Sequence, residues 1–147
     1  MPIFDWERCV QTWISRVSAP WLKPLALLNV LCGDEGMVTA LAIPLALFVL
    51  PVPANLFVEL AVLASPRIEQ GLKELCHRGR PRDPNELGFP SGDCSMVTLW
   101  SVPVLGWWAA APIFLVAWAR VARGAHWPLD TVGGVALGLS LVLPILR

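Results

Sequence analysis

The stretch Arg120-Val-Ala-Arg-Gly-Ala-His126-Trp-Pro-Leu-Asp130 is a short polar cluster between two strongly apolar segments. Two more polar clusters precede it, Lys73-Glu-Leu-Cys-His-Arg-Gly-Arg80-Pro81 and Pro90-Ser91-Gly92-Asp93. Charge beside apolar helices is costly in free energy and usually serves a function. We therefore expect these three clusters to decide both the fold of the chain and its chemistry.

The composition around the clusters is that of a membrane protein. Of the 147 residues, 56% are hydrophobic and 15% are charged. The mean hydropathy is +0.62, which is rare for a soluble domain. Eight tryptophans and no tyrosine fit a chain with aromatic side chains near the membrane interfaces. The formal net charge is zero, so nothing in the bulk charge suggests a nucleic acid as partner.

The N-terminal part is expected to lie on a membrane surface. Residues 3–17 carry apolar side chains at helical spacing, with charged side chains such as Glu7 on the opposite side, which predicts an amphipathic interfacial helix. Residues 21–31 are apolar but contain Lys23 and Pro24. This segment is too short to cross a bilayer, so we expect it at the interface as well.

Four or five spanning helices are expected after these interfacial helices. Their predicted ranges are 36–50, 54–77, 91–108, 111–124 and 131–146. The expected fold class is therefore all-α: a multi-pass membrane bundle of about five spans, with residues 1–33 interfacial and 34–147 as the core of a single domain covering 1–147. Several apolar stretches are shorter than the roughly 20 residues of a free-standing span. Polar helix ends near a common site would supply the missing length.

The connections between the spans alternate in polarity. The links at 51–54 and 109–112 are tight and uncharged, whereas those at 33–36, 78–90 and 123–130 are polar. Because successive spans alternate in direction, all polar links fall on one membrane face and can form one site. Most Arg and Lys residues belong to that proposed site, so their distribution does not fix the orientation by the positive-inside rule.

The clusters contain the residue types that bind a phosphate. Lys73, Arg80 and Arg120 would form a cationic clamp, since arginine offers a planar fork of donors and stays charged at any working pH. Ser91 and Gly92 stand at the start of an apolar helix. The free backbone N–H groups of a helix start can point at an anion, and glycine lets a ligand approach the backbone closely.

His126 and Asp130 provide a nucleophile and its partner. They lie four residues apart, one turn of a continuing helix, so the carboxylate could fix the imidazole tautomer and leave the other ring nitrogen free to attack. No cluster has the spacing of metal ligands, and we expect neither a metal nor another cofactor. Each piece alone also has a plain structural reading, such as an arginine anchored at the interface. The functional interpretation rests on all three clusters together.

These residues resemble a known family. Lys73-x6-Arg80-Pro81, Pro90-Ser91-Gly92 and Arg120-x5-His126-x3-Asp130 look like the three-part signature of the type 2 phosphatidic acid phosphatase (PAP2) superfamily, in its membrane lipid phosphatase branch. The motifs cover about residues 73–130, and the order of helices around them also matches. The resemblance implies a metal-free phosphatase that forms a phosphohistidine, with His126 as nucleophile and Asp130 as its orienting partner.

The resemblance also implies roles for the remaining motif residues. Lys73, Arg80 and Arg120 would bind the phosphoryl oxygens, and Ser91 and Gly92 would add hydrogen bonds. The substrate would be a membrane lipid: phosphatidate-like, phosphatidylglycerophosphate-like or a polyprenyl diphosphate. By the same resemblance the protein would lie in the bacterial inner membrane, with the site on its outer face.

Two positions depart from the family pattern. Ala119 stands where the family has serine, and Asp93 stands where it has the histidine that is taken to protonate the leaving group. Asp93 could be an acid whose proton arrives with the substrate. It could instead be a lesion that leaves binding intact, or the substrate could need no acid, as a lipid diphosphate would. His77 could substitute as the acid, although a solvent-facing loop position is favoured for it.

The expected function is a metal-independent membrane phosphatase that hydrolyses a lipid phosphate or diphosphate. Two alternatives stay open at this stage. A phosphotransferase would use the same residues with a second acceptor. A lipid-phosphate-binding or transport protein would keep the cationic clamp but would have lost the chemistry at Asp93.

Overall fold

The computed structural model describes residues 4–21, 23–24, 27 and 52–145. Apart from an isolated bridge between Gly79 and Leu87, these residues contain helices and connecting loops, so the expected all-α class is confirmed. The elements are α1 (Asp5–Val17), η1 (Ala19–Trp21), α4 (Val52–Cys76), α5 (Gly92–Leu105), η2 (Gly106–Ala109), α6 (Ala110–Ala122), α7 (Pro128–Val142) and η3 (Leu143–Ile145).

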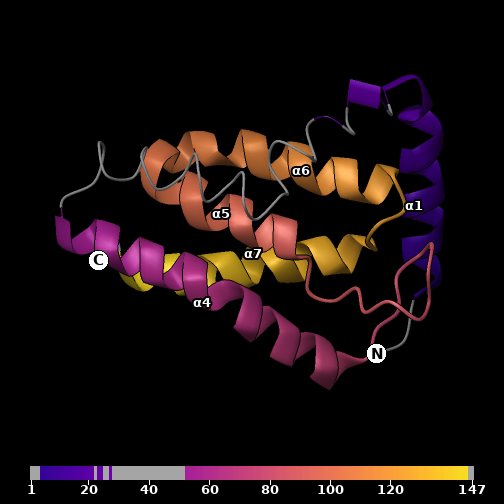
Figure 1. Cartoon of the computed structure of the whole chain (residues 1–147). Coiled ribbons are helices and arrows are strands. Elements are labelled where there is room, and N and C mark those ends of the chain that lie inside the picture. Colours follow the sequence, from indigo (N-terminus) through magenta and orange to yellow (C-terminus); the bar gives the residue numbers. More distant parts are fainter. Residues whose placement is uncertain (1–3, 22, 25–26, 28–51, 146–147) are drawn as a thin grey trace.

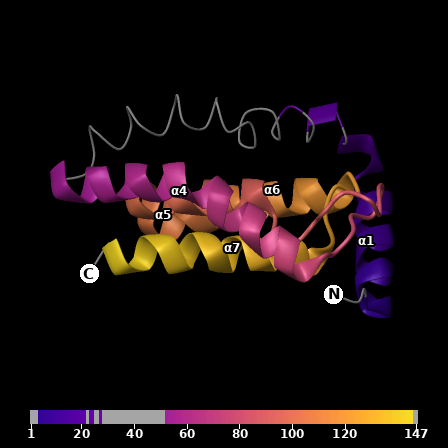
Figure 2. The ribbon, with the colours of Figure 1, turned by 60° about the horizontal axis from the view of Figure 1, so that its bottom comes forward.

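Helices α4 to α7 lie side by side, and α1 lies across one end of them (Figures 1 and 2). The C-terminal ends of α4 and α6 and the N-terminal ends of α5 and α7 all lie at the end next to α1. The polar links 78–90 and 123–130 therefore share this end of the bundle, as the alternation of links predicts. The third polar link, residues 33–36, and the predicted helix 36–50 lie outside the described residues, as does most of the segment 21–31.

The predicted helices 54–77, 91–108, 111–124 and 131–146 correspond to α4, α5, α6 and α7, but one turn between them lies elsewhere than predicted. The chain reverses between α5 and α6 at η2, Gly106–Ala109, and not at 109–112 as the sequence suggested. Gly106 has φ of +55°, a backbone conformation that favours glycine. Pro112 lies instead in the first turn of α6, where the missing N–H of proline removes no helical hydrogen bond.

Helices α5 and α7 pack with their backbones close together. A methyl group on Gly138 would lie 2.7 Å from the Ser95 carbonyl oxygen, and one on Gly134 would lie 3.0 Å from Cβ of Cys94. These two glycines are four residues apart on α7, and their missing side chains permit this close packing. The Ser91 N–H also donates to the Asp130 carbonyl oxygen at 2.9 Å. The starts of α5 and α7 are thereby held together.

One helical stretch in the described part of the chain, Gly92–Ala122, is long and apolar enough to cross a membrane. It consists of α5, η2 and α6, so it turns back on itself at Gly106. Each arm, of 14 or 13 residues, is roughly 20 Å long. Large apolar side chains on the outside of the helices stay exposed, with Trp107 97% and Trp108 82% exposed at the turn.

Helix α1 is anchored to the bundle by a charged side chain. Glu7 is fully buried, although it belongs to the charged side of the predicted amphipathic helix. Farther along the helix, Ile14 packs against Val121 and Ala122. The Ser15 hydroxyl donates to the Ala122 carbonyl oxygen at 3.0 Å. The helix is thus fixed over the polar end of the bundle, while Trp13 on another side remains 59% exposed.

Candidate active site

His126 and Asp130 form a buried pair at the polar end of the bundle. His126 lies in the turn after α6, and Asp130 lies in the first turn of α7; the two residues are 1% and 0% exposed. His126 Nδ1 is 3.7 Å from Asp130 Oδ2. This is longer than a hydrogen bond, but catalytic contacts often shorten only when substrate binds. The predicted pairing of the two side chains is therefore present in the fold.

The contact of His126 with Arg120 indicates which ring nitrogen carries the lone pair. Arg120 Nη2 lies 3.3 Å from His126 Nε2. A guanidinium group can only donate, so Nε2 is the acceptor and carries a lone pair. The proton of the neutral ring is then on Nδ1, the nitrogen that faces Asp130. The lone pair of the ring and the guanidinium cation of Arg120 thus lie next to each other.

Burial lowers the pKa of His126 below its ordinary value. The positive charges of Arg120 and Arg80 lower this pKa further, whereas Asp130 opposes the shift. A buried imidazole is harder to protonate when positive charges are near it. His126 is therefore neutral at neutral pH, as a nitrogen nucleophile must be.

The carboxylate of Asp130 is held from both sides. Its Oδ2 accepts a hydrogen bond from the Trp127 N–H at 2.9 Å, and its Oδ1 lies 3.0 Å from Arg78 Nη1 in an ion pair. Arg78 is fully buried. A methyl group added to Gly88 would lie 2.9 Å from Asp130 Oδ2. The loop after α4 therefore packs directly on the carboxylate. These contacts fix the orientation of the group that faces His126.

Asp93 forms an ion pair with Arg120. Its Oδ2 lies 2.7 Å from Arg120 Nη1, and the two side chains are 15% and 18% exposed. Asp93 is thus placed at the predicted site, beside the cation that also contacts His126. A phosphate that binds Arg120 competes with this carboxylate for the same guanidinium. In contrast, the side chain of His77 is exposed, as favoured for it from the sequence.

Lys73 reaches the site through Glu69. The two residues form an ion pair across one turn of α4, and the Glu69 carboxylate lies so close to Gly92 that a methyl group there would overlap it. Gly92 is the first residue of α5, and Ser91 is its fully buried N-cap residue. The predicted Lys73, Ser91 and Gly92 are therefore brought together at the start of α5.

Arg80 lies at the rim of the site. Its Nε donates to the Leu87 carbonyl oxygen at 3.2 Å, and its Nη1 is 2.9 Å from Glu86 Oε2. Its side chain is 28% exposed. With this pair, each of the three predicted clamp residues contacts a carboxylate: Lys73 contacts Glu69, Arg80 contacts Glu86 and Arg120 contacts Asp93.

Sequence reasoning missed three residues that structure the site: Glu7, Glu69 and Arg78. Arg78 stands between the two cations of the first motif, and nothing in the spacing marks it as the buried one. Glu69 is four residues before Lys73, a spacing that signals a helical ion pair. Glu7 meets Arg78 from 71 residues away, a contact that no local pattern shows. Within the described residues, no group of three or more His, Cys, Asp and Glu side chains could hold a metal ion.

Comparisons with known proteins identify the family. The family model of the PAP2 superfamily matches residues 53–147. The chain belongs to the PAP2 superfamily. The resemblance drawn from the three motifs is thereby confirmed, and with it a lipid phosphatase as the general class.

One relative gives a more specific likeness. The PAP2 chain is 28% identical over 142 residues to an Escherichia coli (strain K12) protein provisionally named undecaprenyl-diphosphatase YbjG. The alignment covers 83% of this chain and 71% of the relative. No solved structure matches the chain.

Proposed function

We propose that this PAP2 protein is an integral membrane phosphatase that hydrolyses a polyprenyl diphosphate, or a related lipid phosphate, through a phosphohistidine at His126 and without a metal. The observation that carries the proposal is the geometry of His126. Its Nε2 lone pair lies 3.3 Å from Arg120 Nη2, and its Nδ1 faces Asp130 at 3.7 Å. A phosphoryl group bound by Arg120 would lie next to the attacking nitrogen.

The proposed reaction has two steps. In the first, Nε2 of His126 attacks phosphorus in line, the bond to the leaving oxygen breaks, and Asp130 stabilises the positive charge that the ring acquires. Lys73, Arg80 and Arg120 would neutralise the phosphoryl oxygens. In the second, water attacks phosphorus, the P–N bond breaks, and inorganic phosphate leaves. The ring is then neutral again, and the proton of the water leaves with the products.

The residue at position 93 favours a diphosphate as substrate. Asp93 contacts Arg120 through an oxygen at 2.7 Å, so its carboxylate is engaged as an ion-pair partner. A lipid diphosphate releases a phosphate-type leaving group, which needs far less protonation than an alkoxide. The name of the E. coli relative points to the same substrate class. We therefore favour a polyprenyl diphosphate over phosphatidate-like and phosphatidylglycerophosphate-like monoesters.

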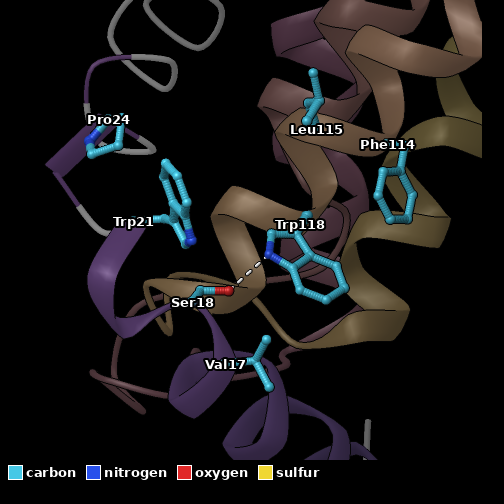
Figure 3. A pocket seen from close by; sticks show the side chains of 7 residues that line it. All are labelled: Val17, Ser18, Trp21, Pro24, Phe114, Leu115 and Trp118. Atoms are coloured by element: carbon cyan, nitrogen blue, oxygen red, sulfur yellow. Dashed lines mark hydrogen bonds between the residues drawn. The ribbon is translucent and has the colours of Figure 1, made fainter.

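The surface of the described helices supports a place in the bilayer. Large apolar side chains such as Leu63 on α4 and Phe114 on α6 are 62% and 61% exposed. An apolar groove of about 560 Å³ runs between η1 and α6, the helix that carries Arg120. Figure 3 shows its lining, with Trp21 and Trp118 on opposite sides and Trp118 Nε1 donating to the Ser18 hydroxyl at 2.8 Å.

We propose that the apolar chain of the substrate stays in the bilayer beside these surfaces while its phosphate enters the polar end. In this proposal α4 to α7 and the predicted helix 36–50 form the five spans, residues 1–33 lie at the interface, and the whole chain is one domain. The site would face the outside of the bacterial inner membrane.

The competing function is a lipid-phosphate-binding or transport protein that does not hydrolyse its ligand. The observation that favours it is Asp93, which stands in place of a proton donor. Release of phosphate from a panel of lipid mono- and diphosphates, by the purified protein in detergent, distinguishes the two. We expect turnover of at least one lipid diphosphate, and none with His126→Ala. Binding of these lipids without phosphate release on any of them would support the binding protein instead.

A further inference from the structure

Three buried charged side chains connect α1 to the proposed nucleophile. Glu7 on α1, Arg78 in the loop after α4 and Asp130 at the start of α7 are each 0% exposed. Arg78 Nη2 forms an ion pair with Glu7 Oε2, and Arg78 Nη1 lies 3.0 Å from Asp130 Oδ1. One arginine thus bridges two carboxylates from distant parts of the chain, and the second carboxylate faces His126.

The N-terminal helix also contacts the backbone of this region. Glu7 Oε1 accepts a hydrogen bond from the Leu129 N–H at 3.1 Å, and Leu129 is the neighbour of Asp130. Glu7 Oε2 accepts from the Phe4 N–H at 3.2 Å. Glu7 therefore holds both the guanidinium that pairs with Asp130 and the backbone that carries Asp130.

A purely structural contact would not require this arrangement. Burying three charges is expensive, and well-packed apolar side chains of similar volume often serve stability equally well or better. Arg78 offsets part of the negative charge of Asp130, and Glu7 offsets part of the positive charge of Arg78.

We propose that Glu7 and Arg78 are positioning residues, which act through Asp130 to orient His126 and to tune its charge, so that α1 is part of the catalytic apparatus. This proposal rests on the proposed role of His126 as nucleophile. Arg78 occupies an unspecified position within the first motif, and Glu7 lies outside the part of the chain that matches the family, residues 53–147.

The charges around His126 predict the direction of the effect. Arg120 and Arg80 disfavour a proton on the ring and Asp130 favours it, Asp93 offsets Arg120, and Arg78 offsets Asp130. Without the charge of Glu7, the positive charge of Arg78 is compensated by Asp130 alone. The carboxylate of Asp130 then stabilises a proton on His126 less. The pKa of His126 should then fall by about 0.5 pH unit, a fraction of the effect of a directly adjacent charge.

The test uses Glu7→Gln, which keeps the size of the side chain and one of its two acceptor oxygens and removes its charge. The matched control is Asp5→Asn, which removes the same charge from the exposed side of the same helix. Both are made in a His77→Gln background, so that His126 is the single histidine of the chain. Nitrogen NMR of the full-length protein in detergent then reports the protonation midpoint and the tautomer of His126 directly.

We expect Glu7→Gln to lower the midpoint and to reduce the share of rings protonated at Nδ1, with Asp5→Asn unchanged. General loosening of the fold would expose His126 and raise its midpoint toward the ordinary value, the opposite direction. If Glu7→Gln raises the midpoint, or matches Asp5→Asn in both midpoint and tautomer, the proposal is wrong.

A kinetic readout separates this proposal from the proposed function. On a lipid diphosphate, Glu7→Gln should lower kcat by roughly tenfold, within the range of orientation effects, and leave KM nearly unchanged because Arg80 and Arg120 are untouched. If the parent protein hydrolyses no lipid, the proposed function fails, yet the NMR result still decides whether Glu7 positions His126.

Discussion

The residue that most distinguishes this site is Asp93. Its carboxylate contacts Arg120 at 2.7 Å, so a phosphate must compete with it for the guanidinium. Two unit charges about 4 Å apart interact by on the order of 4 kcal/mol at an effective dielectric constant of 20. An ionised Asp93 therefore weakens phosphate binding and, unlike a protonated histidine, provides no proton for the leaving group.

Replacing Asp93 with histidine should recover general acid catalysis. General acid help is typically worth roughly 10²–10⁴-fold, so we expect Asp93→His to raise turnover of lipid monoesters by at least about tenfold. Diphosphate turnover should change less, because the departing phosphate needs little protonation. Steady-state phosphate release on matched mono- and diphosphate lipids measures this difference.

Asp93→Asn is the control, since it removes both the charge and the possible acid. It frees Arg120, so KM should fall for both substrate types while monoester turnover stays low. No gain on monoesters with Asp93→His would mean that a missing general acid does not limit this protein. In that event His77, or an Asp93 protonated in the complex, becomes the better candidate.

The pKa of His126 gives a second test at this scale. A lowered pKa keeps the ring neutral, and therefore nucleophilic, as the pH falls below the ordinary 6.5 for histidine. Activity that depends on neutral His126 is then lost only when the pH falls through this lower value. Because Arg80 is one of the causes of the shift, Arg80→Gln should move the midpoint upward. NMR titration in the His77→Gln background measures the protonation midpoint of His126 with and without Arg80→Gln. A midpoint above 6.5 in the protein that keeps Arg80 would contradict a buried His126 with positive charges near it.

The residues of the site could be predicted to different degrees. Arg120, His126 and Asp130 were predictable because they lie within eleven residues of one another, so one turn brings them together. Arg78 could not be predicted as a buried site residue, because the sequence around it contains several other Lys and Arg residues. The contact of Asp93 with Arg120 joins two different helices, and such a contact depends on how α5 and α6 pack.

At the scale of the elements, the site depends on the contact between α5 and α7. Gly134 and Gly138 let the two helices approach, which places the N-cap of α5 beside Asp130. The spacing of the two glycines is typical of close helix packing, but it does not show which helix is the partner. The partners of α1 were not predictable. Amphipathic periodicity separates apolar from charged residues, but it does not show that Glu7 is buried and pairs with Arg78, 71 residues away in the loop after α4.

Gly134→Ala should therefore destabilise the protein. A methyl group there overlaps the Ser91 carbonyl oxygen and lies 3.0 Å from Cβ of Cys94, and such overpacking typically costs about 1–3 kcal/mol. Gly71→Ala is the matched control in α4, where a methyl group meets nothing within 4 Å; it should stabilise by up to about 1 kcal/mol. Denaturant unfolding in micelles measures both, and equal stability of the two variants would refute close α5–α7 packing.

At the scale of the whole molecule, the helices bring the motifs of the PAP2 superfamily to one end, with α1 across that end (Figure 1). The alternation of polar and apolar links predicted this one-sided arrangement. It did not predict the reversal at Gly106, because a glycine followed by two tryptophans reads equally well as the continuation of an apolar helix.

The gathered cations make a metal unnecessary in the proposed mechanism. Lys73, Arg80 and Arg120 already supply the positive charge that Mg²⁺ provides in other phosphoryl-transfer sites. We expect phosphate release to be unchanged after exhaustive treatment with EDTA. Loss of activity that Mg²⁺ restores would show that the clamp is insufficient.

The central claim is that the protein transfers a phosphoryl group to His126. Brief reaction with a lipid diphosphate labelled in its terminal phosphate, followed by denaturation, tests it most directly. We predict label on the protein that acid removes and alkali preserves, located in the peptide that contains His126, absent from His126→Ala and retained in His77→Gln. Hydrolysis of the lipid with no label on His126, under conditions that trap the intermediate, would contradict the account.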